Sequence, residues 1–185
     1  MTWSRKVSRA REILGWLSAL AMLAPVGAMA DTAGLIAEAP KCDNRNGGVD
    51  AAERLRACSA MLAMGGLTAQ QESQVRVNRG WSFSLLGRMS EARGDYVRAV
   101  ELDPSSYVAF NEFALFNLKL GDLDAALVDY VTALRLKPGL PYSLYGLGIV
   151  HIRKGDVKLG EDELAQARAA DSNIDSVFRS IGVHP

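Results

Sequence analysis

The chain has 185 residues, 21 of them basic and 21 acidic, and 49% of them hydrophobic. This length fits a single domain with its own buried core. The absence of a net positive charge argues against a partner such as nucleic acid or an anionic membrane surface.

Residues 1–30 have the three-part pattern of a secretory signal peptide. Four basic residues, Arg5, Lys6, Arg9 and Arg11, precede an apolar stretch over 13–26 and the sequence Ala28-Met29-Ala30. We expect cleavage after Ala30 and a periplasmic or secreted protein without a stable membrane span, because a span needs about 20 apolar residues. An uncleaved anchor is the alternative. Cleavage removes four of the 21 basic residues and one of the 21 acidic ones, which leaves 17 and 20 and a net charge of −3.

Residues 31–49, with Pro40 and the run Asn44-Arg45-Asn46-Gly47-Gly48, predict a loosely ordered N-terminal segment. The two cysteines, Cys42 and Cys58, predict a disulfide, because an exported protein meets an oxidising environment. Two free thiols are the alternative. The first helix is expected from Asp50 to about Ala63, where apolar residues recur at helical spacing.

A fixed step of 34 residues organises the rest of the chain. It separates Gly87, Gly121 and Gly155, and it also separates Pro104 from Pro138. Helices are expected to end at these glycines and just before these prolines. The step predicts helix pairs over 68–86 and 89–102, 107–120 and 123–136, and 141–154 and 157–170, followed by a short helix near 174–181 that covers the last pair. Small residues such as Gly80 and Ala92 are expected to let paired helices approach closely.

The residues at this step match a known signature. The second unit has Phe110, Ala114, Gly121, Ala126, Tyr130, Ala133 and Pro138, and the first has Gly80, Phe83, Gly87, Ala92, Tyr96, Ala99 and Pro104. The third is more divergent, with Gly160 and Ser172 at positions where alanine and proline are usual. The pattern resembles the tetratricopeptide repeat, or TPR, family. The resemblance implies an all-α, right-handed α-solenoid over 50–181, with repeats at 73–106, 107–140 and 141–174, an N-terminal helix and a C-terminal capping helix.

In this family the first helix of each pair lines a concave groove that holds a protein or peptide. The resemblance assigns ten residues to this face, here called the strip: Val77, Trp81, Asn111, Leu115, Leu118, Lys119, Tyr142, Tyr145, Ile149 and Arg153. The alternative is that some of them pack inside the chain, against the N-terminal segment or the terminal helix. The lysine–asparagine clamp with which some members hold C-terminal carboxylates is absent, because Val77, Trp81, Glu112, Tyr142 and Gly146 occupy the matching positions.

Nothing in the sequence predicts an enzyme, a cofactor or a metal site. The histidines are His151 and His184, and neither has an evident nucleophile or ligand cluster near it in the sequence. We expect His151 to pack between the two helices of its pair. A catalytic role for His151 is the less favoured alternative.

The sequence therefore favours an exported adaptor that binds a protein or peptide segment of a cell-envelope partner in the concave groove. The alternative is a structural or assembly subunit of an envelope complex that acts through its convex or N-terminal surface. The oligomeric state and the identity of the partner are left open.

Overall fold

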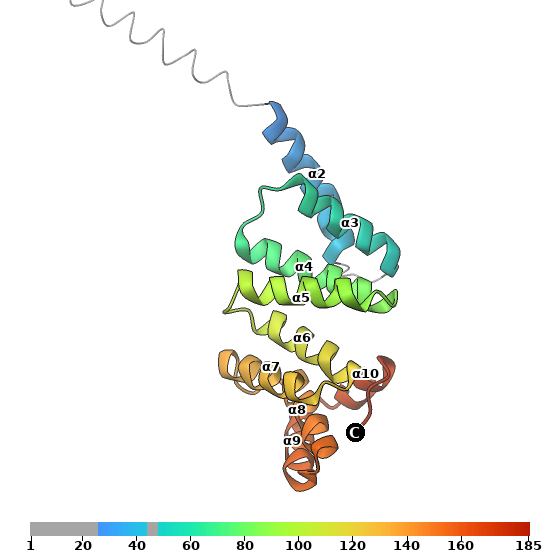
Figure 1. Ribbon diagram of the computed structural model, residues 1–185, viewed down its shortest axis with the longest axis vertical. Coiled ribbons are helices and arrows are strands. Elements are labelled where there is room, and N and C mark those ends of the chain that lie inside the picture. The colour runs from blue at the N-terminus through green and yellow to red at the C-terminus, as the bar shows by residue number, and fades with distance from the viewer. Residues whose placement is uncertain (1–25, 44–47) are drawn as a thin grey trace, which may run out of the picture.

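A computed structural model describes residues 26–43 and 48–185. Within this part the chain is helical, without strands, and its nine helices stack along one long axis from α2 to α9 (Figure 1). The helices are α2 Val26–Asp43, α3 Ala51–Met64, α4 Ala69–Leu85, α5 Met89–Leu102, α6 Tyr107–Leu120, α7 Leu123–Leu136, α8 Pro141–Lys154, α9 Val157–Ala170 and α10 Ile174–Ser180. The predicted signal peptide lies largely outside the described residues.

The predicted helix pairs are confirmed. Helix α4 packs on α5, α6 on α7 and α8 on α9, and the pairs then stack on one another. Thr68 and Gln71 form a capping box at the start of α4. Gly121 and Gly155 end α6 and α8 with φ of 79° and 99°, a left-handed conformation that favours glycine.

Helix α2 corrects the expectation of a loosely ordered segment over 31–43, whereas residues 44–47 lie outside the described part of the chain. The chain is helical to Asp43, and α2 forms a further pair with α3. Cys42 is buried in a cluster with Cys58, against which Leu35 and Ala39 pack. Pro40 lies in the last turn of α2, where its missing N–H costs a single backbone hydrogen bond. Tertiary contacts therefore stabilise a helix that local sequence does not predict.

Glycine at position 160 allows α8 and α9 to approach unusually closely. A Cβ added to Gly148 would lie 2.8 Å from the backbone oxygen of Gly160, and a Cβ added to Gly160 would overlap the backbone of Gly148. In the first pair the matching contact is looser, because a Cβ on Gly80 would lie 3.4 Å from the carbonyl oxygen of Ala92. The departure from alanine at position 160 thus has a packing reason.

The short helix α10 caps the stack as expected. Ile174 and Phe178 are buried in the largest apolar cluster, which extends from α6 to the C-terminal end, and Val183 joins them beyond the helix. None of the helices in the described ranges is both long and apolar enough to cross a membrane.

Candidate functional site

More than half of the strip is buried. Six of its ten members are buried: Val77, Asn111, Leu115, Leu118, Tyr145 and Ile149. The cause is the stacking itself, since α4 is covered by α6, α6 by α8 and α8 by α10. The assignment of these six residues to a partner-binding face is therefore corrected: they pack between neighbouring helices and offer almost no surface to a partner, and of the six only Val77 borders a hollow described below.

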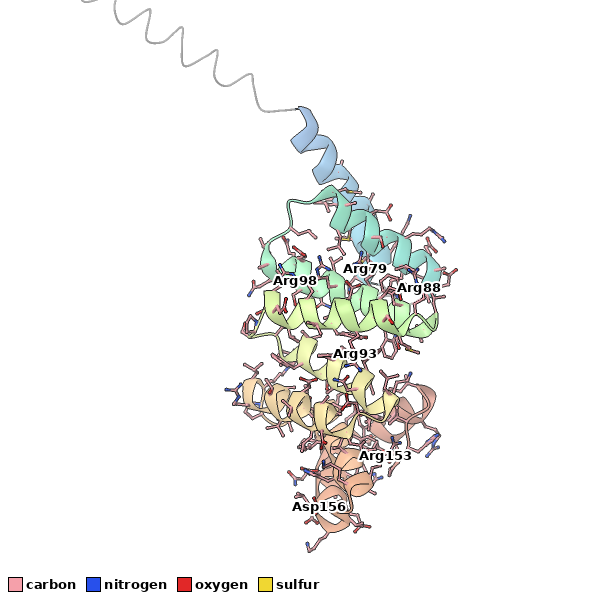
Figure 2. All side chains as sticks on the ribbon, viewed as in Figure 1. Arg79, Arg88, Arg93, Arg98, Arg153 and Asp156 are labelled. Carbon is pink, nitrogen blue, oxygen red and sulfur yellow. A yellow bond between two sulfur atoms is a disulfide. The ribbon has the colours of Figure 1, made fainter. Side chains whose placement is uncertain are left out.

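The third repeat is closed by the C-terminal segment. The rings of Tyr145 and Phe178 are 4.5 Å apart, and the Tyr145 hydroxyl donates to Oδ1 of Asp175 at 2.5 Å. Burial and the Asp175 carboxylate raise the pKa of Tyr145, while hydrogen bonds from Arg168 and Tyr145 lower the pKa of Asp175. Arg153, labelled in Figure 2 beside α10, donates from Nη2 to the carbonyl oxygen of His184 at 2.8 Å. These contacts fasten α10 and the last residues over the concave side of α8.

Tyr142 lies at the edge of this closure. Its side chain is 40% exposed, and its ring centroid is 6.3 Å from that of Phe178. It is the strip residue of the third repeat that keeps a substantial apolar surface free.

The open part of the concave face lies over α4 and α6. Two hollows meet there, and both are lined by Gln74 and Asn78, whose side chains are joined by a hydrogen bond of 3.2 Å. The first, of about 420 Å³, extends towards α2 and is lined by Ala39, Cys42, Asp43, Met61, Leu67, Gln71, Gln74, Val75 and Asn78. The second, of about 200 Å³, reaches α6 and is lined by Arg54, Gln74, Val77, Asn78, Trp81, Val108 and Glu112. We call the two together the α4 groove.

Trp81 provides the apolar surface of this groove. It is half-buried and packs against the core cluster that contains Leu115 and Leu118. The ammonium nitrogen of Lys119 lies 5.5 Å from its ring centroid, within the range of a cation–π interaction. Trp81 and Lys119 are thus the strip residues that the structure brings together at an accessible place.

Asn111 supports the groove from inside. Its Oδ1 accepts a hydrogen bond of 2.8 Å from the Ser143 hydroxyl on α8, and its Nδ2 donates to Glu112 at 3.2 Å. Asn111 therefore acts as a bridge between α6 and α8 rather than as a free hydrogen-bonding group.

Two charged side chains reach the second hollow without a salt bridge to any residue in the described part of the chain. The Nε atom of Arg54 is buried and lacks a hydrogen-bond partner there, and burial lowers the pKa of its guanidinium. Burial raises the pKa of Glu112, and the hydrogen bond from Asn111 only partly opposes this. Arg54 comes from α3 and Glu112 from α6, on either side of α4.

His151 has a structural partner. Its Nδ1 lies 2.7 Å from Oε2 of Glu163 on the paired helix α9. Over residues 26–43 and 48–185, no group of three or more His, Cys, Asp or Glu side chains is arranged to hold a metal ion. This arrangement offers binding surfaces and hydrogen bonds.

Arg54 and Asn78 are missing from the strip. The strip residues were assigned from the three regular repeats. Arg54 lies on α3, which pairs with α2 before the first of these repeats. The one available signal was its place next to Leu55 at the start of a predicted helix, which borders the buried stripe of that helix.

Comparison with family profiles agrees with the helix pairs. Residues 73–106 match the profile described as "Tetratricopeptide repeat", and residues 117–155 match one described as "TPR repeat". The chain contains tetratricopeptide repeats. Proteins built from TPR repeats are generally interaction scaffolds rather than enzymes.

Solved structures share the TPR fold at low sequence identity. MamA has a TM-score of 0.59 and 15% identity, over 70% of this chain and 73% of its own. YrrB, described as a TPR protein with an unusual peptide-binding site, has a TM-score of 0.57 and 19% identity, over 72% of this chain and 66% of its own. BtubC from P. vanneervenii has a TM-score of 0.58 and 20% identity, over 73% and 59%. At these identities the likeness concerns the fold alone.

Proposed function

We propose that this chain is an exported TPR adaptor that binds an extended segment of a cell-envelope protein in the α4 groove. The observation that carries the proposal is the contrast along the concave face. The third repeat is closed by α10, whereas over α4 the side chains of Asn78, Trp81 and Arg54 line open hollows.

The chemistry of the groove suits a peptide. Amide side chains such as those of Gln74 and Asn78 both donate and accept hydrogen bonds, as a peptide backbone requires. Trp81 offers a half-buried aromatic surface, and tryptophan is enriched among the residues that dominate binding energy. The fold shared with YrrB, a protein described as having a peptide-binding site, supports the same reading.

Export is supported by two features of the N-terminal part. Residues 1–30 have the pattern of a cleaved signal peptide, and Cys42 and Cys58 lie as a pair with their Cα atoms 4.8 Å apart, a separation that suits a disulfide. Such bonds persist in oxidising compartments such as the periplasm. The adaptor would therefore meet its partner outside the cytoplasm.

A second candidate, an assembly subunit that uses the convex face, rests on exposed apolar side chains. Val128 and Val131 on α7 are 64% and 49% exposed. Val97 on α5 and Leu159 on α9 are also exposed, at 39% and 49%, but none of these four side chains lines either hollow of the α4 groove. The groove is therefore preferred.

Photo-crosslinking in cells separates the two candidates. A photoreactive amino acid would replace Asn78 or Trp81 in the groove and, as matched positions on the convex side, Val128 or Val131. Capture of one envelope protein from both groove positions and from neither convex position is the expected result. Capture from the convex positions alone would contradict the proposal and favour the assembly subunit.

A further inference from the structure

The second hollow of the α4 groove carries opposite charges on its two walls. We propose that it selects a partner segment with one acidic and one basic side chain, the acidic one bound by Arg54 and the basic one by Glu112. This inference rests on the proposed function and specifies the chemistry of the partner.

Arg54 requires an anion that the described chain does not provide. Its Nε is buried without a hydrogen-bond partner, and its guanidinium forms no salt bridge with a described residue. Removing a charged group from water costs free energy that a counter-charge with hydrogen bonds can recover. A carboxylate matches the planar guanidinium with two parallel hydrogen bonds. An aspartate or glutamate of the partner would supply both the charge and the acceptors.

Glu112 lacks a cation within the described part of the chain, just as Arg54 lacks an anion. Its hydrogen bond from the Asn111 amide, 3.2 Å long, is neutral and leaves the carboxyl without a counter-ion. The nearby Tyr96 and Tyr130 hydroxyls are buried and have no hydrogen-bond partner, so neither of them donates to Glu112. Burial raises the pKa of Glu112, which is the direction expected for a carboxyl without a cation beside it. A lysine or arginine of the partner would supply that cation.

The geometry fixes the order of the two charges. Helix α4 lies between α3, which carries Arg54, and α6, which carries Glu112 (Figure 1). The paired amides of Gln74 and Asn78 lie between them on α4. A segment that crosses α4 therefore meets a cation on the α3 side and a carboxyl on the α6 side. Reversing the segment would place like charges together, which disfavours binding.

A defined peptide array tests this selection. The protein would be purified in the form that remains after export and any signal-peptide cleavage in the cell. It would be applied to immobilised peptides of one length in which acidic, basic and neutral residues are varied independently at every position. Wild-type protein is expected to favour peptides that carry one acidic and one basic residue in a fixed order. Arg54→Gln should reduce the preference for the acidic residue about tenfold or more and leave the basic preference in place, and Glu112→Gln should do the converse.

Matched controls remove the same charge elsewhere. Arg56→Gln changes an exposed arginine on the same helix, and Glu101→Gln changes an exposed glutamate on α5. Neither control should alter the preferences, and all four variants should keep the wild-type melting temperature within a few degrees.

The outcomes distinguish this inference from the function on which it rests. Peptides bound without charge preference, with binding lost on Trp81→Ala, would overturn the charge selection and keep the groove as a peptide site. Preferences that survive both Arg54→Gln and Glu112→Gln would also overturn the selection. Failure of the wild-type protein to bind any peptide would overturn both.

Discussion

Nδ1 of His151 lies 2.7 Å from Oε2 of Glu163, between the two helices of the third repeat. Glu163 belongs to a series, because Asp95, Asp129 and Glu163 are 34 residues apart and all three are buried on the second helix of a pair. The partner on the first helix changes from arginine to asparagine to histidine. Asp95 accepts two hydrogen bonds of 2.7 Å from Arg79, and Asp129 accepts one of 3.0 Å from Asn117. In each repeat a buried acidic residue on the second helix therefore links it to the first helix.

Loss of the His151 imidazole should destabilise the fold. In His151→Leu the Glu163 carboxyl would be buried without its partner, and we expect the free energy of unfolding to fall by about 1–3 kcal/mol. Urea unfolding measures this change. His184→Leu, at the exposed C-terminal end, is the matched control and should change little. Loss of partner binding in His151→Leu at unchanged stability would contradict the structural role.

Asp129 should make stability depend on pH. Burial raises its pKa from 3.8 to about 6, because Asn117 supplies only a neutral donor. The folded state therefore binds a proton more readily than the unfolded state, so the contribution of Asp129 to stability rises as pH falls from above 6 towards 4. In Asp129→Asn the charge is removed, and the new amide can donate to Oδ1 of Asn117, which lacks a partner. We expect this variant to gain about 1–3 kcal/mol at pH 8 and little at pH 4.5.

Asp95→Asn is the matched control for that experiment. The same change at the equivalent position of the first repeat breaks the bidentate pair with Arg79 and the contact of 3.2 Å with Arg76. It should destabilise the protein by about 1–3 kcal/mol at pH 7, the opposite sign to Asp129→Asn. Unfolding curves at several pH values measure both variants. A loss of stability at pH 8 in Asp129→Asn would contradict the prediction, because it would show that the ionised Asp129 carboxylate stabilises the folded state.

Replacing Gly146 with alanine should destabilise the protein, whereas the same replacement at Gly94 should not. An added Cβ at Gly146 would overlap the buried ring of Tyr130, so Gly146→Ala is expected to cost about 1–3 kcal/mol through overpacking. At Gly94, inside α5, an added Cβ meets nothing within 4 Å. Gly94→Ala should therefore stabilise the protein by about 0.5–1 kcal/mol through helix propensity. Thermal unfolding compares the two, and equal effects would contradict the close approach of α7 and α8.

A disulfide between Cys42 and Cys58 should stabilise the fold next to the first hollow, which Cys42 lines. It closes a loop with a sequence separation of 16 between buried cysteines, for which a stabilisation of about 3 kcal/mol is typical. The double variant Cys42→Ala, Cys58→Ala should melt at a lower temperature and lose sensitivity to a reductant. A wild-type melting temperature that does not change on reduction would contradict this expectation.

The sequence predicted the repeats well but did not predict which residues of the strip are buried. Glycines 121 and 155 and prolines 104 and 138 mark helix ends locally, so the pairs from α4 to α9 could be placed without a structure. Helix α2 was missed because its order depends on packing against α3 and on Cys58, which are tertiary contacts. Tyr145 and Ile149 were assigned to the groove because their positions usually face the groove in this family. In this chain, Phe178 and its neighbours on α10 bury them. Arg54 was missed because only the first helices of the three regular repeats were assigned to the groove, and α3 is not one of them.

The central claim is that the α4 groove, and not the convex face, holds the partner. The most direct measurement is the affinity of the segment captured by crosslinking, determined by calorimetry with wild-type protein, Trp81→Ala and Val128→Ala. We predict a loss of affinity of about thirtyfold for Trp81→Ala, equivalent to about 2 kcal/mol, and an unchanged affinity for Val128→Ala. Equal affinities for wild-type protein and Trp81→Ala, with weaker binding by Val128→Ala, would contradict the claim.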